Sequence, residues 1–175
     1  MRYLFIVLIF LLLPYAAPAV DVTLHNAPAQ VYFSPDGGAT DAIVNEIGKA
    51  KSEVLVQAYS FTSAPIARAL VDAHKRGVHV EIILDKSQRS ERYSSADFTA
   101  HAGIPTYIDA QHAIAHNKIM IIDGETVVTG SFNFTKAAEQ KNAENLLILK
   151  SRELARLYID NWQAHRKHSE EYIGR

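Results

Sequence analysis

A nucleophile, a cation and hydrogen-bond donors stand at close spacing in the second half of the chain. His116 and Lys118 lead into an apolar run, residues 119–122, whose β-branched side chains predict a buried strand. Alternate residues of a strand point to the same side, so His116 and Lys118 are expected to share a face. Ser131 and Asn133 would also share one if that segment is extended. An imidazole that can attack, surrounded by groups that can hold charged oxygens, suits a reaction at an anionic phosphate.

The spacing resembles the HxKxxxxD motif of the phospholipase D superfamily and the GSxN sequence that follows it, here His116, Lys118, Asp123, Gly130, Ser131 and Asn133. The continuation 134–139 and the pair Glu144-Asn145 resemble the small single-motif bacterial endonucleases of that superfamily, the Nuc type. The similarity runs from about Val31 to Trp162. Such a combination of positions is specific, whereas an HxK sequence alone is not.

Each motif residue receives an expected role and an alternative. His116 would attack phosphorus and form a covalent phosphohistidine that water then hydrolyses; the alternative is a structural core histidine. Lys118 would supply a fixed charge to the phosphoryl oxygens, or else blunt an exposed sheet edge. Ser131 and Asn133 would donate hydrogen bonds to the same oxygens, and Gly130 would allow close backbone approach. The alternative for residues 130–133 is a plain turn.

Two acidic residues complete the expected catalytic set. Asp123 belongs to the motif, but it precedes Gly124 and could cap a hairpin turn, so a structural role is favoured. The resemblance implies that an acidic residue at the position of Glu144 orients a catalytic imidazole through its other ring nitrogen. A solvated glutamate at a strand entry is an equal alternative for Glu144.

The chain contains one HxKxxxxD motif, whereas larger members of the superfamily carry two that face each other. The leaving oxygen needs a proton from a second group. A two-fold homodimer that places His116 of each subunit beside one phosphate would supply it. The alternative within one chain is His112, which we interpret as a loop residue that could line the site.

No metal or cofactor is expected. His112 and His116 with Asp109 or Asp123 could be drawn as a zinc site, but no HExxH-like spacing supports it. Lys118 and paired imidazoles would provide the charge that a metal brings. The remaining histidines are expected to be surface or packing residues: His25, His74, His79, His101, His165 and His168.

The resemblance favours nucleic acid, DNA rather than RNA, as the substrate. A polar loop with Lys86, Arg89, Arg92 and Tyr93 could follow a sugar-phosphate backbone, or it could be an ordinary solvated loop. No base-reading module is apparent, so cleavage would be sequence-nonspecific. Two alternatives remain: a membrane-associated phospholipid phosphodiesterase, and a phosphate-binding module without activity.

Composition indicates one ordinary globular domain. The 175 residues are 48% hydrophobic and 21% charged, with a net charge of −1 and no cysteine, so disulfides and thiolate metal sites are excluded. Arg2, an apolar run over residues 3–13 and Ala17-Pro18-Ala19 predict a cleaved signal peptide over residues 1–19. The mature domain would be residues 20–175, in the periplasm or secreted. An uncleaved anchor is the alternative.

The expected fold is a single α/β domain with a mixed, mostly parallel sheet flanked by helices. Strands are expected over residues 31–33, 54–59, 78–84, 106–109, 119–122, 126–129 and 146–149. Helices are expected over residues 41–50, 63–76, 96–102 and 151–165. Asp123-Gly124 would form the turn of a hairpin.

Overall fold

Eight strands form one sheet in the order β1-β7-β6-β5-β2-β3-β4-β8. The computed structural model describes residues 19–175, so the predicted signal peptide lies outside them except for its last residue. The strands are β1 (Ala29–Ser34), β2 (Glu53–Ala58), β3 (His79–Asp85), β4 (Thr106–Asp109), β5 (Lys118–Ile122), β6 (Thr126–Gly130), β7 (Glu144–Lys150) and β8 (Glu170–Glu171).

The helices are α1 (Ala39–Lys49), α2 (Ala64–Lys75), α3 (Ala96–His101), α4 (Lys136–Gln140) and α5 (Arg152–His168), with a 3₁₀ turn, η1 (Lys86–Arg89). Helix α5 ends at His168 rather than near residue 165. No helix formed by residues 19–175 combines the length and the hydrophobicity needed to cross a bilayer.

The structure confirms a single α/β domain with a mixed sheet flanked by helices. The expected predominance of parallel pairing was wrong, because only β2–β3 and β3–β4 pair in parallel among the described strands. Helix α2 connects β2 to β3, and η1 and α3 lie between β3 and β4 in the chain, because parallel neighbours need a crossover connection. Strand β1 does not join β2 across α1; it pairs antiparallel with β7 at the sheet edge.

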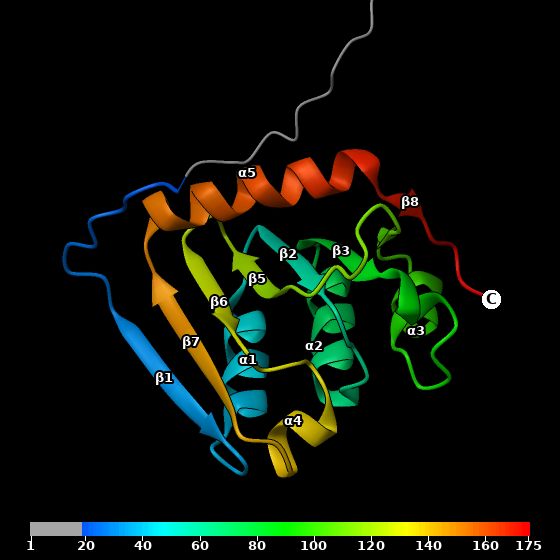
Figure 1. Ribbon diagram of the computed structural model, residues 1–175, viewed down its shortest axis with the longest axis horizontal. Coiled ribbons are helices and arrows are strands. Elements are labelled where there is room, and N and C mark those ends of the chain that lie inside the picture. Colours follow the sequence, from blue (N-terminus) through cyan, green and yellow to red (C-terminus); the bar gives the residue numbers. More distant parts are fainter. Residues whose placement is uncertain (1–18) are drawn as a thin grey trace, which may run out of the picture.

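Helices cover both faces of the sheet (Figure 1). The larger core lies on the side of α1 and α2 and includes Ile43, Ile66 and Met120. A smaller core lies under α5 and contains Trp162, which is 3% exposed. The Trp162 indole donates to the carbonyl of Val56 at 2.9 Å, so this side chain packs inside the domain.

The first turn of α1 is capped by a residue from another helix. The helix begins at Ala39 rather than at residue 41, and Gly38 occupies the N-cap position and offers no side chain. The Glu139 carboxylate instead accepts hydrogen bonds from the amides of Gly38 (3.0 Å) and Thr40 (2.7 Å). Helix α4, which follows the motif, therefore stabilises the start of α1.

The predicted hairpin is confirmed: β5 and β6 pair antiparallel. Asp123 and Gly124 have φ values of 53° and 62° at its turn. Both lie in the left-handed region that favours glycine and, less strongly, aspartate. This turn fixes the register between β5 and β6, and Lys118 lies at the end of β5 far from the turn.

Candidate active site

His116 lies in the loop between β4 and β5, just before Lys118. Hydrogen bonds hold the backbone on both sides of it: the Ala115 amide donates to Asp85 Oδ2 at 2.7 Å, and Asn117 O accepts from the Tyr59 amide at 2.8 Å. The His116 ring packs on the Tyr59 ring with a centroid distance of 4.6 Å. The His116 side chain is exposed, and nothing in residues 19–175 hydrogen-bonds to its ring. The interpretation as a buried core histidine is therefore wrong.

Lys118 begins β5 and is 7% exposed. Its Nζ donates to the His116 carbonyl at 2.8 Å and lies 5.1 Å from the Tyr59 ring centroid. Strand β5 is internal to the sheet, between β6 and β2, so the edge-strand interpretation of Lys118 is wrong. Burial lowers the pKa of the Lys118 ammonium, and the negative charge of Glu144 opposes this effect.

Glu144 begins β7 and lies on the same sheet face as Lys118, as the registers of β5, β6 and β7 show. Its carboxylate accepts a hydrogen bond from Asn142 Nδ2 at 3.1 Å. Within the described chain, no hydrogen bond joins Glu144 to His116. The Glu144 charge thus raises the pKa of Lys118 without a salt bridge between the two among the described residues, and a single chain does not show the expected orientation of an imidazole.

Gly130 ends β6 in a conformation that requires glycine, with φ of 148°. A Cβ atom there would lie 2.3 Å from the carbonyl oxygen of Asn145. That carbonyl accepts hydrogen bonds from the amides of Ser131 (3.1 Å) and Phe132 (3.2 Å). The glycine thus permits the close approach of β7 that fixes the segment carrying Ser131.

Ser131 and Asn133 keep unused hydrogen-bonding capacity. Ser131 Oγ accepts from Asn145 N (3.1 Å) and Nδ2 (3.3 Å), which leaves its own proton free to be donated. Asn133 Oδ1 is buried without a partner among the described residues. Because Oδ1 can only accept, it would pair with a donor, whereas the Asn133 atom that can donate to phosphoryl oxygens is Nδ2.

Asp123 lies at the end of β5 opposite Lys118 and does not join the other motif residues. Its carboxylate accepts hydrogen bonds from the amides of Lys51, Ser52 and Glu53 and from Ser52 Oγ. Burial opposes ionisation of Asp123, but the bonds from Ser52 and Glu53 outweigh it and hold its pKa below the usual range. These contacts connect the hairpin turn to the start of β2.

The predicted basic loop makes contacts within the chain. Lys86 Nζ donates to the carbonyl of His112 at 3.1 Å, and Arg89 pairs with Glu170 at 2.7 Å. Arg92 lies 5.5 Å from the ring centroid of Tyr93, which is 71% exposed. Lys86 thus helps to hold the loop that bears His116, while Arg92 and Tyr93 remain at the surface.

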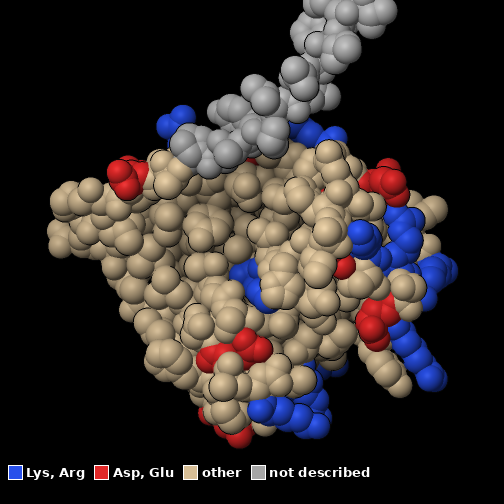
Figure 2. All heavy atoms as spheres, viewed as in Figure 1, with Lys and Arg blue, Asp and Glu red and all other residues tan. Residues whose placement is uncertain are grey.

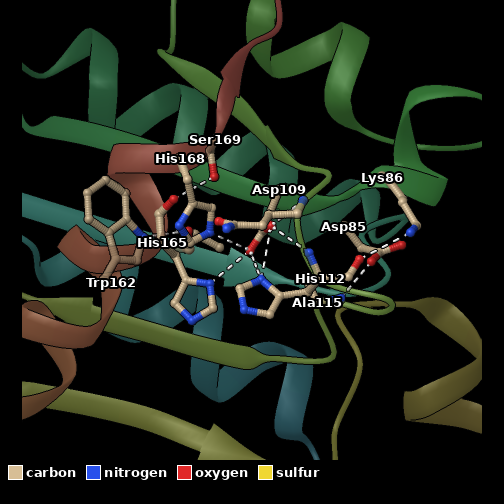
Figure 3. Close-up of polar contacts among 11 residues, drawn as sticks. Asp85, Lys86, Asp109, His112, Ala115, Trp162, His165, His168 and Ser169 are labelled. Atoms are coloured by element: carbon tan, nitrogen blue, oxygen red, sulfur yellow. Dashed lines mark hydrogen bonds and ion pairs between the residues drawn. The ribbon is translucent and has the colours of Figure 1, made fainter. Parts of the chain in front are cut away.

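A cluster of imidazoles was missed from the sequence. Asp109 contacts His112, as in one of the zinc sites considered from the sequence. The other two residues of the cluster are His165 and His168 rather than His116 (Figure 3). Burial opposes ionisation of Asp109, yet the hydrogen bonds from the imidazoles hold its pKa far below the usual range. The available sequence signal was the pair of three-residue spacings, 109 to 112 and 165 to 168, in segments far apart in the chain.

Residues 43–166 match the family model described as "Cardiolipin synthase, PLD-like domain". The chain belongs to the phospholipase D superfamily. A phospholipase D of Rickettsia conorii is 43% identical over 139 residues, which are 79% of this chain and 70% of that protein. This superfamily membership confirms the resemblance of the motif, and the chain is a phosphodiesterase of the hydrolase class.

Two solved structures share the fold. Nuc of Salmonella typhimurium, a phospholipase D family member, is 40% identical with a TM-score of 0.81; the match covers 84% of this chain and 99% of that one. NucT of Helicobacter pylori, at 23% identity, has a TM-score of 0.77 over 84% of this chain and 100% of that one.

Proposed function

We propose that the protein is a sequence-nonspecific endonuclease in which His116 is the nucleophile. The observation that carries this proposal is the His116 side chain: it is exposed, makes no ring hydrogen bond in residues 19–175, and lies beside the buried Lys118. An imidazole held through its backbone and packed on one ring face leaves its nitrogens free to react.

The reaction proceeds in two displacements. A ring nitrogen of His116 attacks phosphorus, the bond to the leaving oxygen breaks, and that oxygen takes a proton from a general acid. Water then attacks the phosphohistidine and releases the imidazole. Lys118, Ser131 and Asn133 stabilise the charged phosphoryl oxygens, so the chemistry at this site needs no metal ion.

The general acid comes from a second copy of the chain. His116 stands on an open surface; a hollow of about 430 Å³ near the starts of α1 and α2 includes Lys136 but none of the motif residues. Figure 2 shows a broad, largely uncharged area over β6 and β7. Beside it, β1 exposes Val31 (56%) and Phe33 (68%). Phe33 shares its sheet face with Asn145, whose side chain contacts Ser131, so an uncharged surface beside this part of the site suits a symmetric dimer.

The substrate proposed is DNA, because the chain is 40% identical to Nuc over nearly all of that protein. Arg92 and Tyr93 offer an exposed cation and ring for backbone contact and base stacking. Figure 2 shows basic side chains mixed with acidic ones on the α3 and β8 side, so binding relies on local contacts. Affinity for DNA is expected to fall steeply with salt.

A second candidate is phospholipid hydrolysis. The Rickettsia relatives carry the name phospholipase D at 40–45% identity, and the same histidine chemistry would cleave a lipid phosphodiester. This alternative would gain weight if the apolar residues 3–13 were retained as an anchor.

The test is to incubate the purified protein with plasmid DNA and, separately, with phosphatidylcholine vesicles, both in the presence of a chelator. The proposal expects nicked and linear plasmid, intact lipid, and no cleavage by His116→Ala. Release of choline with intact plasmid would establish the lipid alternative. Plasmid cleavage by the variant at the wild-type rate would show that a contaminant or another residue is responsible.

We further infer export through a signal peptide cleaved after Ala19, to the periplasm or the medium. The support is the sequence of residues 1–19 alone. N-terminal sequencing of the protein from its host should begin at Val20, and recovery of residues 3–13 in the mature chain would contradict it.

A further inference from the structure

A buried carboxylate and three imidazoles converge where the loop after β4 meets the end of α5 (Figure 3). Asp109 Oδ2 lies 2.9 Å from His112 Nδ1, 2.8 Å from His165 Nδ1 and 3.3 Å from His168 Nε2. The three rings pack against one another with centroid distances of 4.8 to 5.4 Å. We propose that these four residues bind one divalent transition-metal ion, with Zn²⁺ as the best fit.

The same lone pairs can serve hydrogen bonds or an ion. Asp109 Oδ1 accepts from the Gln111 amide at 3.1 Å and lies 3.1 Å from His112 Nδ1, while Oδ2 faces all three imidazoles. As hydrogen bonds, these contacts require each neutral ring to place its one N–H toward Asp109. A cation at the centre uses the opposite tautomer of each ring, with the lone pairs of all four groups directed at the ion.

The spacing of Asp109 from the three imidazoles is close to that around a tetrahedral ion. All four ligand atoms lie within 4.8 Å of one another. Zn²⁺ bonds of about 2.0–2.1 Å place tetrahedral ligands roughly 3.3 Å apart. The three distances from Asp109 Oδ2 to the imidazole nitrogens are 2.8 to 3.3 Å, equal to or slightly shorter than that distance between ligands. Imidazole nitrogens with one carboxylate are a donor set suited to zinc and neighbouring transition metals rather than to calcium or magnesium.

The site is partly shielded and still reachable. Asp109 is fully buried, and the His165 side chain is 15% exposed. His168 and His112 are 29% and 45% exposed, so an ion can enter from their side. In residues 19–175 no lysine or arginine pairs with Asp109, which leaves the imidazoles or an ion to balance its buried charge.

The ion would link α5 to the β4–β5 loop, which carries His116. His165 and His168 are one turn apart near the end of α5, and His112 lies in the β4–β5 loop. Lys86 and Asp85 hold the same loop from its other side, through the His112 carbonyl and the Ala115 amide. The role assigned to the ion is structural, because the motif residues His116 and Lys118 are not among its ligands. This site departs from the expectation, drawn from the sequence, that the chain binds no metal.

The test measures metal binding directly, on full-length protein without a polyhistidine tag. The protein is stripped with EDTA, dialysed and titrated with ZnCl₂ in a calorimeter, and its melting temperature is recorded with and without Zn²⁺. We expect saturable binding of one ion per chain. A Zn²⁺ concentration 100-fold above Kd should raise the melting temperature by roughly 5–10 °C. Replacement of bound zinc by Co²⁺ should give visible absorption bands of a tetrahedral site.

The decisive variant is His165→Ala combined with His168→Ala, with His25→Ala as the matched control. The double variant should bind Zn²⁺ roughly 100-fold more weakly or not at all, while the control should bind as wild type. His168→Gln, a single change at a partly exposed position, serves if the double variant does not fold. It should weaken binding and shift the Co²⁺ spectrum.

Absence of saturable Zn²⁺ binding by the wild-type chain would overturn the proposal, as would equal binding by wild type and the histidine variants. Because these readouts do not involve DNA cleavage, the metal site and the proposed endonuclease activity can fail independently.

Discussion

Lys118 donates a hydrogen bond from its side chain to the main-chain carbonyl of His116, at 2.8 Å. The ammonium is thus fixed relative to the backbone of the proposed nucleophile, and the ring of Tyr59 contacts both residues. A charge held in place before the reaction stabilises a transition state more than a mobile one, because no reorganisation is required. The pair therefore forms the centre of the proposed site.

Removal of the Lys118 charge should slow the chemical step. We expect Lys118→Met, which keeps most of the side-chain volume, to lower kcat by roughly 10²–10³-fold while changing DNA affinity much less. Single-turnover cleavage with excess enzyme measures the chemical step. Lys51→Met, at an exposed lysine, is the matched control and should be unaffected. A Lys118→Met enzyme with wild-type kcat would remove Lys118 from the mechanism.

Glu144 should raise the pKa of Lys118. Burial lowers the pKa of Lys118, and the Glu144 carboxylate raises it. In Glu144→Gln only the lowering effect of burial remains, so Lys118 should lose its proton at a lower pH. The NMR shifts of the Lys118 side chain, followed against pH, should show this lower pKa, whatever the change in rate. A pKa that stays in place, or moves upward, would separate Glu144 from the charge of Lys118.

Asp123 should matter for stability rather than for chemistry. Loss of its hydrogen bonds in Asp123→Ala should cost about 1–3 kcal/mol of unfolding free energy. The pKa of Asp123 is lower in the folded protein than in the unfolded chain, where it is about 3.9. Ionised Asp123 therefore stabilises the fold fully above the unfolded pKa, and this stabilisation is lost as pH falls through the folded pKa. Urea unfolding at neutral pH measures the loss, with the exposed Asp160→Ala as control. A folded variant with strongly reduced activity per molecule would instead indicate a catalytic role.

Gly130 should tolerate no side chain. Gly130→Ala places a Cβ 2.3 Å from the Asn145 carbonyl at a φ of 148°, so we expect a loss of at least about 2 kcal/mol and displacement of Ser131. Gly48, in α1, has no atom within 4 Å of a built Cβ. Gly48→Ala should therefore stabilise the protein by about 0.5–1 kcal/mol. Thermal unfolding compares the two variants, and equal effects would refute the steric account.

The sequence predicted features that depend on neighbouring residues. The β5–β6 hairpin was foreseen because Asp123-Gly124 is a local turn signal between two β-branched runs. The motif was foreseen because its spacing is fixed within a short segment. The pairing of β1 with β7 was not foreseen, since pairing between strands more than a hundred residues apart depends on which sheet edge remains free. The Asp109 cluster escaped for the same reason: its histidines come from a loop and from the end of α5.

The capping of α1 by Glu139 shows a further limit. The helix was expected from residue 41, yet it begins at Ala39 after the N-cap Gly38, and a carboxylate from α4 accepts hydrogen bonds from the amides of Gly38 and Thr40. Local propensity predicted the helix but not its capping residue, because Glu139 is brought to α1 by the segment that follows Asn133. The same segment connects the motif to the large core through Phe134, which is fully buried.

The central claim is that His116 becomes covalently attached to the substrate during turnover. The direct measurement is to mix the enzyme with 5′- and 3′-labelled single-stranded and duplex oligonucleotides, quench within milliseconds in alkaline detergent, and separate protein from DNA on a denaturing gel. Wild type should give a labelled protein band that is absent in His116→Ala, and mass spectrometry should place the phosphoramidate on His116. Rapid cleavage with no trapped species at any quench time, or an adduct on another residue, would contradict it.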